Sequence, residues 1–127
     1  MKVGIKNQIK KTVSSDLTAK AMGSGRLDVF ATPAMVAMME EAAHTSVEAE
    51  LEEGQGTVGT SMTVSHLAAT PVGMEVTCES ELIEVDGRKL VFEIKAMDEA
   101  GIIGEAKHER FIIDSEKFLA KTNAKLK

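Results

Sequence analysis

The chain has 127 residues, 43% of them apolar and 28% charged, and a formal net charge of −5 at pH 7. A chain of this length fits one domain with a core of its own, so we expect a single domain over residues 1–127. The acidic balance and the absence of Trp and Tyr argue against a nucleic-acid partner, because binding one needs basic patches and aromatic platforms on which bases stack.

Cysteine content and hydropathy narrow the class further. Cys78 is the only cysteine, which excludes an intrachain disulfide and a zinc cluster of cysteines. No stretch approaches the ~20 apolar residues that a membrane span requires, and the N-terminal segment MKVGIKNQIKK has no apolar signal core. We therefore expect a cytoplasmic protein with no membrane partner.

The first half of the chain predicts one strand, one loop and one long helix. Residues 4–13 mix polar and apolar side chains as a first strand does, and residues 14–25 predict a loop with a short helical turn. Thr32-Pro33 is typical of a helix start, since Thr accepts free backbone N–H groups and Pro needs no donor there. Residues 34–53 are rich in Ala, Met and Glu and predict helix, which glycines at 54 and 56 end.

The second half predicts four strands between residues 57 and 114, separated by turns at 70–73, 86–87 and 99–101. A last short helix is expected after Asp114. A long helix buries its stripe only by lying across the sheet, so the pattern predicts an α+β fold with an antiparallel β-sheet wrapped around one long central helix. That is the hot-dog arrangement, although the pattern alone also permits other α+β folds. The edge strands of so small a sheet need covering, which favours a dimer.

Helical geometry separates two neighbouring glutamates. At about 100° per residue, Glu40 falls inside an apolar stripe and Glu41 points away from it. The stripe comprises Val36, Met39, Ala43, Val47 and Leu51. A carboxylate on an apolar face is costly unless it is paired, and such groups are often functional. The spacing equally allows an edge position from which Glu40 reaches solvent or pairs with His44 one turn on.

His66 stands out in the same way on a strand. By alternation it shares a face with the more apolar set, Val58, Thr60, Met62, Val64 and Ala68. An imidazole with its usual pKa near 6.5 exchanges protons at neutral pH, which makes His66 a candidate acid or base. A core histidine with a satisfied hydrogen bond is the structural alternative, and the pattern leaves both open.

Thr32 has a structural role as helix N-cap, and a chemical role is compatible with it. Free N–H groups at a helix start favour negative charge, so an oxyanion formed beside Thr32 would be stabilised. Helical side chains lean toward the N-terminus, which shortens the two-turn gap between Thr32 and Glu40. Together with His66 they offer a hydroxyl, a carboxylate and an imidazole to one carbonyl, although spacing alone does not bring them together.

Other polar residues are weaker candidates. Cys78 alternates with apolar neighbours and is expected to be an inert core thiol. The three histidines have no metal-binding spacing, so we expect no metal site. Arg110 shares a strand face with His108 and is a candidate partner for a carboxylate or a CoA phosphate, with an ion pair to Glu105 or Glu109 as the alternative.

A set of short motifs runs in one order along nearly the whole chain. It comprises Val29-Phe30-Ala31-Thr32, Glu40, Gly59-Thr60, residues 64–73 (VSHLAATPVG), residues 85–90 (VDGRKL), His108-Glu109-Arg110 and Glu116-Lys117-Phe118. Each motif is weak alone, but the ordered set resembles the fluoroacetyl-CoA thioesterase family of hot-dog proteins. The resemblance implies a single hot-dog thioesterase domain over residues 1–127, which hydrolyses a small acyl-CoA to the free acid and CoA.

The resemblance also implies roles for individual residues. Glu40 would act as nucleophile or as base for water, His66 would carry the proton, and Thr32 would orient the carboxylate or the carbonyl. The Gly59 backbone N–H is implied as an oxyanion donor, and Arg110 as a supporting residue near the site. The family further implies a homodimer with active sites at or near the subunit interface. Coenzyme A is then part of the substrate, and no cofactor is expected.

The match is weakest just before the Val29 motif, where the fluoroacetyl-specific enzyme gates its acyl pocket with an aromatic side chain. Arg26 stands there in this chain, with Phe30 as a further expected substrate contact. We therefore expect a general short-chain acyl-CoA, including one whose polar or charged acyl group Arg26 could meet. Two other functions stay open: an acyl-CoA hydratase or dehydratase, and a non-catalytic dimer that binds acyl-CoA as a sensor.

Overall fold

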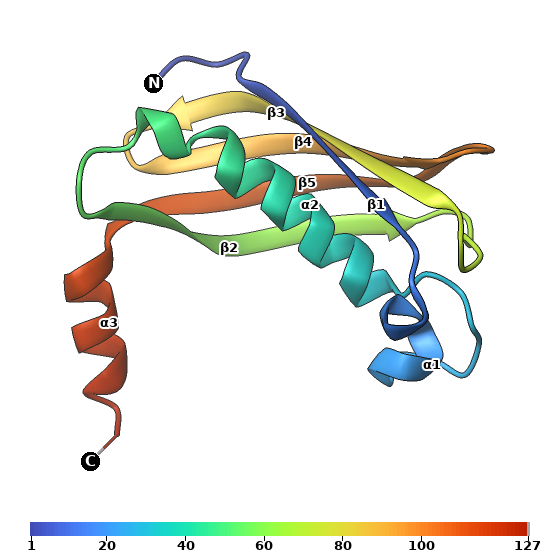
Figure 1. Cartoon of the computed structure of the whole chain (residues 1–127). Coiled ribbons are helices and arrows are strands. Elements are labelled where there is room, and N and C mark those ends of the chain that lie inside the picture. Colours follow the sequence, from blue (N-terminus) through green and yellow to red (C-terminus); the bar gives the residue numbers. More distant parts are fainter. Residues whose placement is uncertain (127) are drawn as a thin grey trace.

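A five-stranded antiparallel sheet wraps around one long helix in the computed structural model, which describes residues 1–126 (Figure 1). The strands lie in the order β1-β3-β4-β5-β2, so β1 and β2 form the two edges. The elements are β1 (Lys6–Thr12), η1 (Ser15–Leu17), α1 (Ala19–Met22), α2 (Thr32–Ser46), η2 (Glu48–Glu50), β2 (Gln55–His66), β3 (Glu75–Asp86), β4 (Lys89–Asp98), β5 (Gly101–Asp114) and α3 (Ser115–Asn123). The predicted α+β architecture is confirmed.

Helix α2 lies across the concave face of the sheet and supplies much of the core (Figure 1). Its buried residues are Ala34, Met35, Met38, Met39, Ala42 and Ala43. The centre of this buried face lies to one side of the predicted apolar stripe, and Val36, which belongs to that stripe, is only half-buried. The helix ends at Ser46 rather than Glu53, and a short 3₁₀ turn follows. The Ser46 hydroxyl donates to the Ala43 carbonyl, a local bond that competes with helix continuation, and the β-branched Val47 propagates helix poorly.

Two features determine how the helix α2 and the edge strand β2 lie against β5. At Gly104 on β5, an added Cβ would lie 2.7 Å from Met35 Sδ, so the glycine leaves room for the Met35 side chain of α2 against this strand. On β2 the pairing with β5 shifts between Gly59 and Ser61, which leaves Thr60 as an extra, bulged residue. The bulge breaks the strict alternation assumed from sequence, and it places Gly59, like Met62, on the face toward α2.

Cys78 is fully buried in the core, as the alternation on β3 predicts. Burial raises the pKa of its thiol from 9.0 to about 12, because the thiolate would lose its hydration. An alkylating reagent should therefore leave the native protein unmodified at pH 8 and react with one thiol per chain once a denaturant is added. Mass spectrometry of both samples checks this, and rapid modification of the native protein would contradict the buried placement.

The same shift in pKa makes the stability of the fold depend on pH. Because the Cys78 thiol loses its proton at a lower pH in the unfolded chain than in the folded one, it lowers the free energy of unfolding as pH rises from about 9 toward 12.

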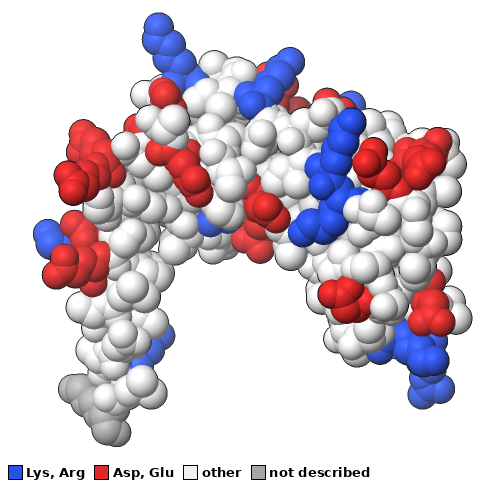
Figure 2. Space-filling view, in the orientation of Figure 1, with Lys and Arg blue, Asp and Glu red and all other residues white. Residues whose placement is uncertain are grey.

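The C-terminal helix α3 projects away from the body beyond the edge strand β2 (Figure 1). Its first turn is capped by the Asp114 side chain, which accepts from the Lys117 N–H. No α3 residue is buried, and Phe118 and Leu119 are exposed. The space-filling view shows a hollow beneath the sheet between α3 and the α1 end, with acidic and basic side chains interspersed over the visible face (Figure 2). None of the described helices is long and apolar enough to cross a membrane.

Candidate functional site

Thr32 is the first residue of α2 and not its N-cap, so the capping role predicted for it is wrong. Ala31 occupies the cap position in an extended conformation and makes no side-chain cap bond. The Ala31 carbonyl instead accepts from the Met35 N–H, which starts the helix one residue earlier than Thr32-Pro33 implied. The hydroxyl of Thr32 is therefore free for another partner, and it lies 2.7 Å from His66 Nδ1.

His66 ends β2 and faces Thr32 across this hydrogen bond. The strand is held there by Leu67, whose N–H donates to the Ile103 carbonyl at 2.6 Å. Burial lowers the pKa of His66 below its usual 6.5, which favours the neutral imidazole near pH 7. Its Nε2 atom is buried and has no hydrogen-bond partner among the described residues. A neutral imidazole with one nitrogen on a hydroxyl and the other unpaired can accept or pass a proton.

A cleft of about 310 Å³ opens beside this pair. Thr32 and His66 line it together with Ala19, Ser24, Val29, Phe30, Leu67, Ala68 and Ala69. Phe30 forms a buried wall, held by its N–H bond to the Thr70 carbonyl. The lining is mostly small and apolar, which suits a short acyl chain better than a bulky one. Arg26 is exposed and does not line the cleft.

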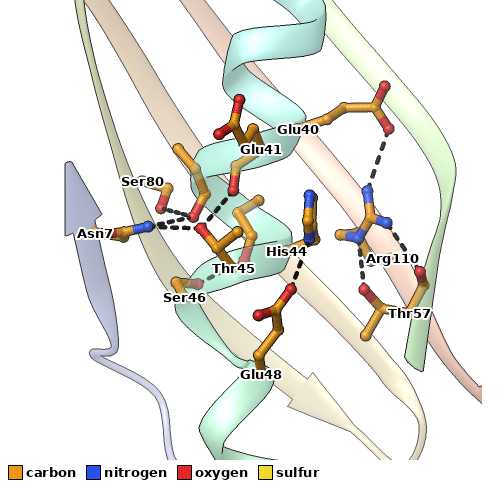
Figure 3. A network of polar contacts seen from close by, with 12 residues as sticks. Asn7, Glu40, Glu41, His44, Thr45, Ser46, Glu48, Thr57, Ser80 and Arg110 are labelled. Atoms are coloured by element: carbon orange, nitrogen blue, oxygen red, sulfur yellow. Dashed lines mark hydrogen bonds and ion pairs between the residues drawn. The ribbon is translucent and has the colours of Figure 1, made fainter. Parts of the chain in front are cut away.

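Glu40 lies two turns further along α2 and does not contact Thr32 or His66 within the described chain. Glu40 is eight residues beyond Thr32 along the helix, a rise of about 12 Å. The Glu40 side chain is 42% exposed at the edge of the buried face, and its Oε2 accepts from Arg110 Nη1 at 3.2 Å. Glu40 therefore lies at the edge of the apolar face, as the structural alternative predicted, but its partner is Arg110 and not His44. His44 pairs with Glu48 instead. Figure 3 shows Glu40 directed toward Arg110 and Glu41 directed away from it. The Glu41 carboxylate instead pairs with Lys11, whose Nζ lies 3.7 Å from Glu41 Oε1.

Arg110 binds Glu40 and is itself held in place by Thr57. It is 7% exposed, and its Nε and Nη2 donate to the Thr57 hydroxyl and carbonyl at 2.8 and 3.0 Å (Figure 3). Burial lowers the pKa of Arg110, and the Glu40 carboxylate beside it offsets part of that shift. Arg110 therefore pairs with the Glu40 carboxylate, and not with Glu105 or Glu109 as the alternative prediction had it.

Gly59 of β2 lies against the side chains of Glu40 and Arg110. A Cβ at this position would lie 2.7 Å from Glu40 Oε2, 3.2 Å from His108 Cε1 and 3.3 Å from Arg110 Nη1. The glycine therefore leaves room for the carboxylate and both basic side chains in the positions they occupy. His108, on β5, is fully buried and completes the group, although sequence reasoning gave it no role. Its alternation with Arg110 on one strand face was the signal that pointed there.

The residues expected to form the site thus lie in two separate groups, one of Thr32 and His66 and one of Glu40, Gly59 and Arg110. Within residues 1–126 no group of three or more His, Cys, Asp or Glu side chains is arranged to hold a metal ion. The chemistry available is that of a hydroxyl, an imidazole, a carboxylate and a guanidinium. These groups serve acyl transfer, in which an oxyanion forms and a proton moves.

Comparison with known proteins agrees with this chemistry. Residues 13–116 match the family described as fluoroacetyl-CoA-specific thioesterase. The fluoroacetyl-CoA thioesterase of Streptantibioticus cattleyicolor is 45% identical over 98 residues, which are 77% of this chain and 70% of that protein.

Solved structures agree in fold over the whole chain. A structure of the fluoroacetyl-CoA thioesterase FlK superposes with a TM-score of 0.94 at 37% identity, covering 100% of this chain and 98% of that one. A thioesterase superfamily member from Thermus thermophilus gives a TM-score of 0.88 at 27% identity, covering 95% of this chain and 90% of that one. A hot-dog-like protein from Thermanaerovibrio acidaminovorans shares the fold alone, at 24% identity and a TM-score of 0.90, with 98% and 93% covered. The predicted hot-dog fold is confirmed.

Proposed function

The chain belongs to the fluoroacetyl-CoA-specific thioesterase family and is an acyl-CoA thioester hydrolase, and we propose that Thr32, Glu40 and His66 carry out its reaction on a short-chain acyl-CoA. The observation that carries the assignment of residues is the 2.7 Å contact between the Thr32 hydroxyl and His66 at the mouth of a small apolar cleft. Coenzyme A is part of the substrate, water is the second reactant, and we expect the reaction to need no cofactor.

The acyl group is proposed to enter the cleft beside Phe30, with its carbonyl carbon near the Thr32 hydroxyl. Glu40 removes a proton from a water that attacks this carbon, and the thioester C–S bond breaks as the tetrahedral intermediate collapses to the free acid. If Glu40 instead attacks the carbon directly, the same bond breaks but the acyl group stays on the Glu40 carboxylate as an anhydride, which a water then hydrolyses. His66, which its lowered pKa keeps neutral at rest, accepts the proton that the attacking water loses and passes it to the departing CoA thiolate. The positive first turn of α2 and the Gly59 N–H are the proposed stabilisers of the oxyanion.

A second copy of the chain is proposed to bring the two halves of the site together. Edge strand β2 is twelve residues long and faces the hollow beneath the sheet, where it is open to pairing (Figure 2). If two β2 strands pair antiparallel about a two-fold axis at residues 60 and 61, Gly59 lies opposite residue 62 of the other copy. The partner's His66 is then about 10 Å nearer to Glu40, along the strand, than the chain's own His66. The proposed enzyme is therefore a homodimer whose sites draw on both subunits.

Release of CoA thiol from a panel of short acyl-CoA esters tests the proposal. We expect turnover of acetyl-CoA and its small or polar derivatives, with activity falling as the acyl chain outgrows a cleft of about 310 Å³. A thiol-reactive dye measures the rate, and the buried Cys78 adds no background while the protein stays folded. Binding of the esters without hydrolysis of any of them would sink the proposal and support a sensor instead.

A further inference from the structure

His108 is a buried histidine that the proposed reaction does not use directly. His108 lies on β5 between Phe92 of β4 and Met62 of β2 and is 1% exposed. Its two ring nitrogens both have partners at hydrogen-bonding distance. Nδ1 lies 2.8 Å from the Ser61 carbonyl oxygen, and Nε2 lies 3.1 Å from Arg110 Nη1. A buried histidine with both nitrogens paired is fixed in orientation.

The chemistry of the two partners fixes the proton on this ring. A carbonyl oxygen only accepts, so Nδ1 must carry the hydrogen that reaches Ser61. A guanidinium only donates, so Nε2 must present its lone pair to Arg110. Only the neutral imidazole protonated at Nδ1 satisfies both contacts. Burial and the Arg110 charge also lower the pKa of His108, while the Ser61 bond and Glu40 raise it.

The contact matters because Arg110 Nη1 is shared. The same nitrogen that donates to His108 Nε2 also donates to Glu40 Oε2 at 3.2 Å, and Glu40 Oε2 is 3.8 Å from His108 Nε2. Thr57 holds the opposite edge of the guanidinium through Nε and Nη2. The position of the Glu40 carboxylate is therefore set by a chain of bonds that runs from the Ser61 carbonyl through His108 and Arg110.

We propose that His108 is a positioning residue, whose neutral Nδ1-protonated ring holds Arg110 Nη1 where it fixes one oxygen of Glu40 and leaves the other free to react. Protonation of His108 at Nε2 would remove the lone pair that Arg110 needs and place two cations together. The titratable or charged groups that face the ring are Glu40 from α2 and Arg110 from β5, since β2 presents Ser61 and Thr57 and β4 presents Phe92. The positioning is then lost in acid.

A pair of amide substitutions separates the two ring nitrogens. In His108→Asn the side-chain amide can still donate to the Ser61 carbonyl, but it offers nothing to Arg110. In His108→Gln the longer side chain places an acceptor oxygen near the position of Nε2. We expect His108→Asn to lower kcat at least about tenfold with KM within about threefold, because a small displacement of a reacting group is costly. His108→Gln should retain kcat within about threefold of the wild type.

A purely structural role for His108 predicts a different outcome. Both variants would then lose thermal stability and activity in parallel, or Gln would fare no better than Asn, and either result would overturn the proposal. The acid limb of kcat gives a further check, since the part due to His108 should disappear in His108→Gln while the part due to His66 remains. Thermal melting of each variant shows that the compared proteins are folded.

The inference rests on the proposed role of Glu40, and NMR separates its failure from that of the proposed function. In ¹⁵N-labelled wild-type protein near pH 7, His108 should show a protonated Nδ1 and an unprotonated Nε2, whether or not any acyl-CoA is hydrolysed. A ring protonated at Nε2, or at both nitrogens, would exclude the bond to Arg110 and refute the inference even in an active enzyme. The expected ring state in a protein that turns over no ester would instead leave the network intact and refute the proposed function.

Discussion

Glu40→Gln is expected to lower kcat by at least about 100-fold on every acyl-CoA that the wild type hydrolyses, which is the scale of acid–base catalysis by a positioned side chain. The amide keeps the size of the carboxylate and still offers an oxygen to Arg110 Nη1, which now donates to Glu40 Oε2 at 3.2 Å. It can neither attack the thioester carbonyl nor take a proton from water. Because the substrate is proposed to bind in the cleft beside Thr32 and Phe30, KM or the dissociation constant for a CoA ester should change much less than kcat.

Glu41→Gln is the matched control, since it makes the same chemical change one residue along the same helix. Glu41 is exposed, and its only ion pair in the described structure is with Lys11 at 3.7 Å, a surface contact of small energetic value. Its kcat should stay within about twofold of the wild type. If both variants lost activity alike, the effect would come from net charge or helix stability. If neither did, Glu40 would have no part in the chemistry.

The sequence predicts the fold better than the site because the two depend on different information. Helix and strand periods and turn residues are local, and they placed the start of α2 and all four later strands close to their observed limits. The end of α2 was missed because Ser46 and Val47 are single residues inside a segment that otherwise favours helix. The N-cap of α2 was predicted at Thr32 but lies at Ala31. The Thr32-Pro33 pair is compatible with a helix that begins at either Thr32 or Pro33.

The site depends on contacts between segments far apart in the chain. Glu40 and Arg110 are 70 residues apart, and no period within either segment indicates that they meet. The bulge at Thr60 also reverses the face that simple alternation assigns to Gly59, so the closeness of Gly59 to the carboxylate could be found only from the structure. The resemblance to the family supplied the names of the residues, and it did not supply their arrangement in space.

Mixing two inactive variants is expected to restore activity if the site spans two subunits. In a heterodimer of Glu40→Gln and His66→Ala chains, one site receives Glu40 from the His66→Ala chain and His66 from the Glu40→Gln chain, and is therefore intact. The other site carries both substitutions. Random exchange makes half of the dimers mixed, so about a quarter of the wild-type kcat should return. Each variant alone should stay at least about 100-fold below the wild type.

The experiment is performed by unfolding and refolding the two variants together, with each variant refolded alone as the control for recovery of native protein. A second mixture, of Glu40→Gln with Glu40→Ala, gives every site a defect at the same residue and should remain inactive. Recovery only in the first mixture requires Glu40 and His66 to act from different subunits. No recovery in an exchanged dimer would place all three residues in one chain, which requires Glu40 to leave Arg110 and cross two turns of α2 toward Thr32. The register proposed for β2 would then be wrong, because that register is what draws the partner's His66 toward Glu40.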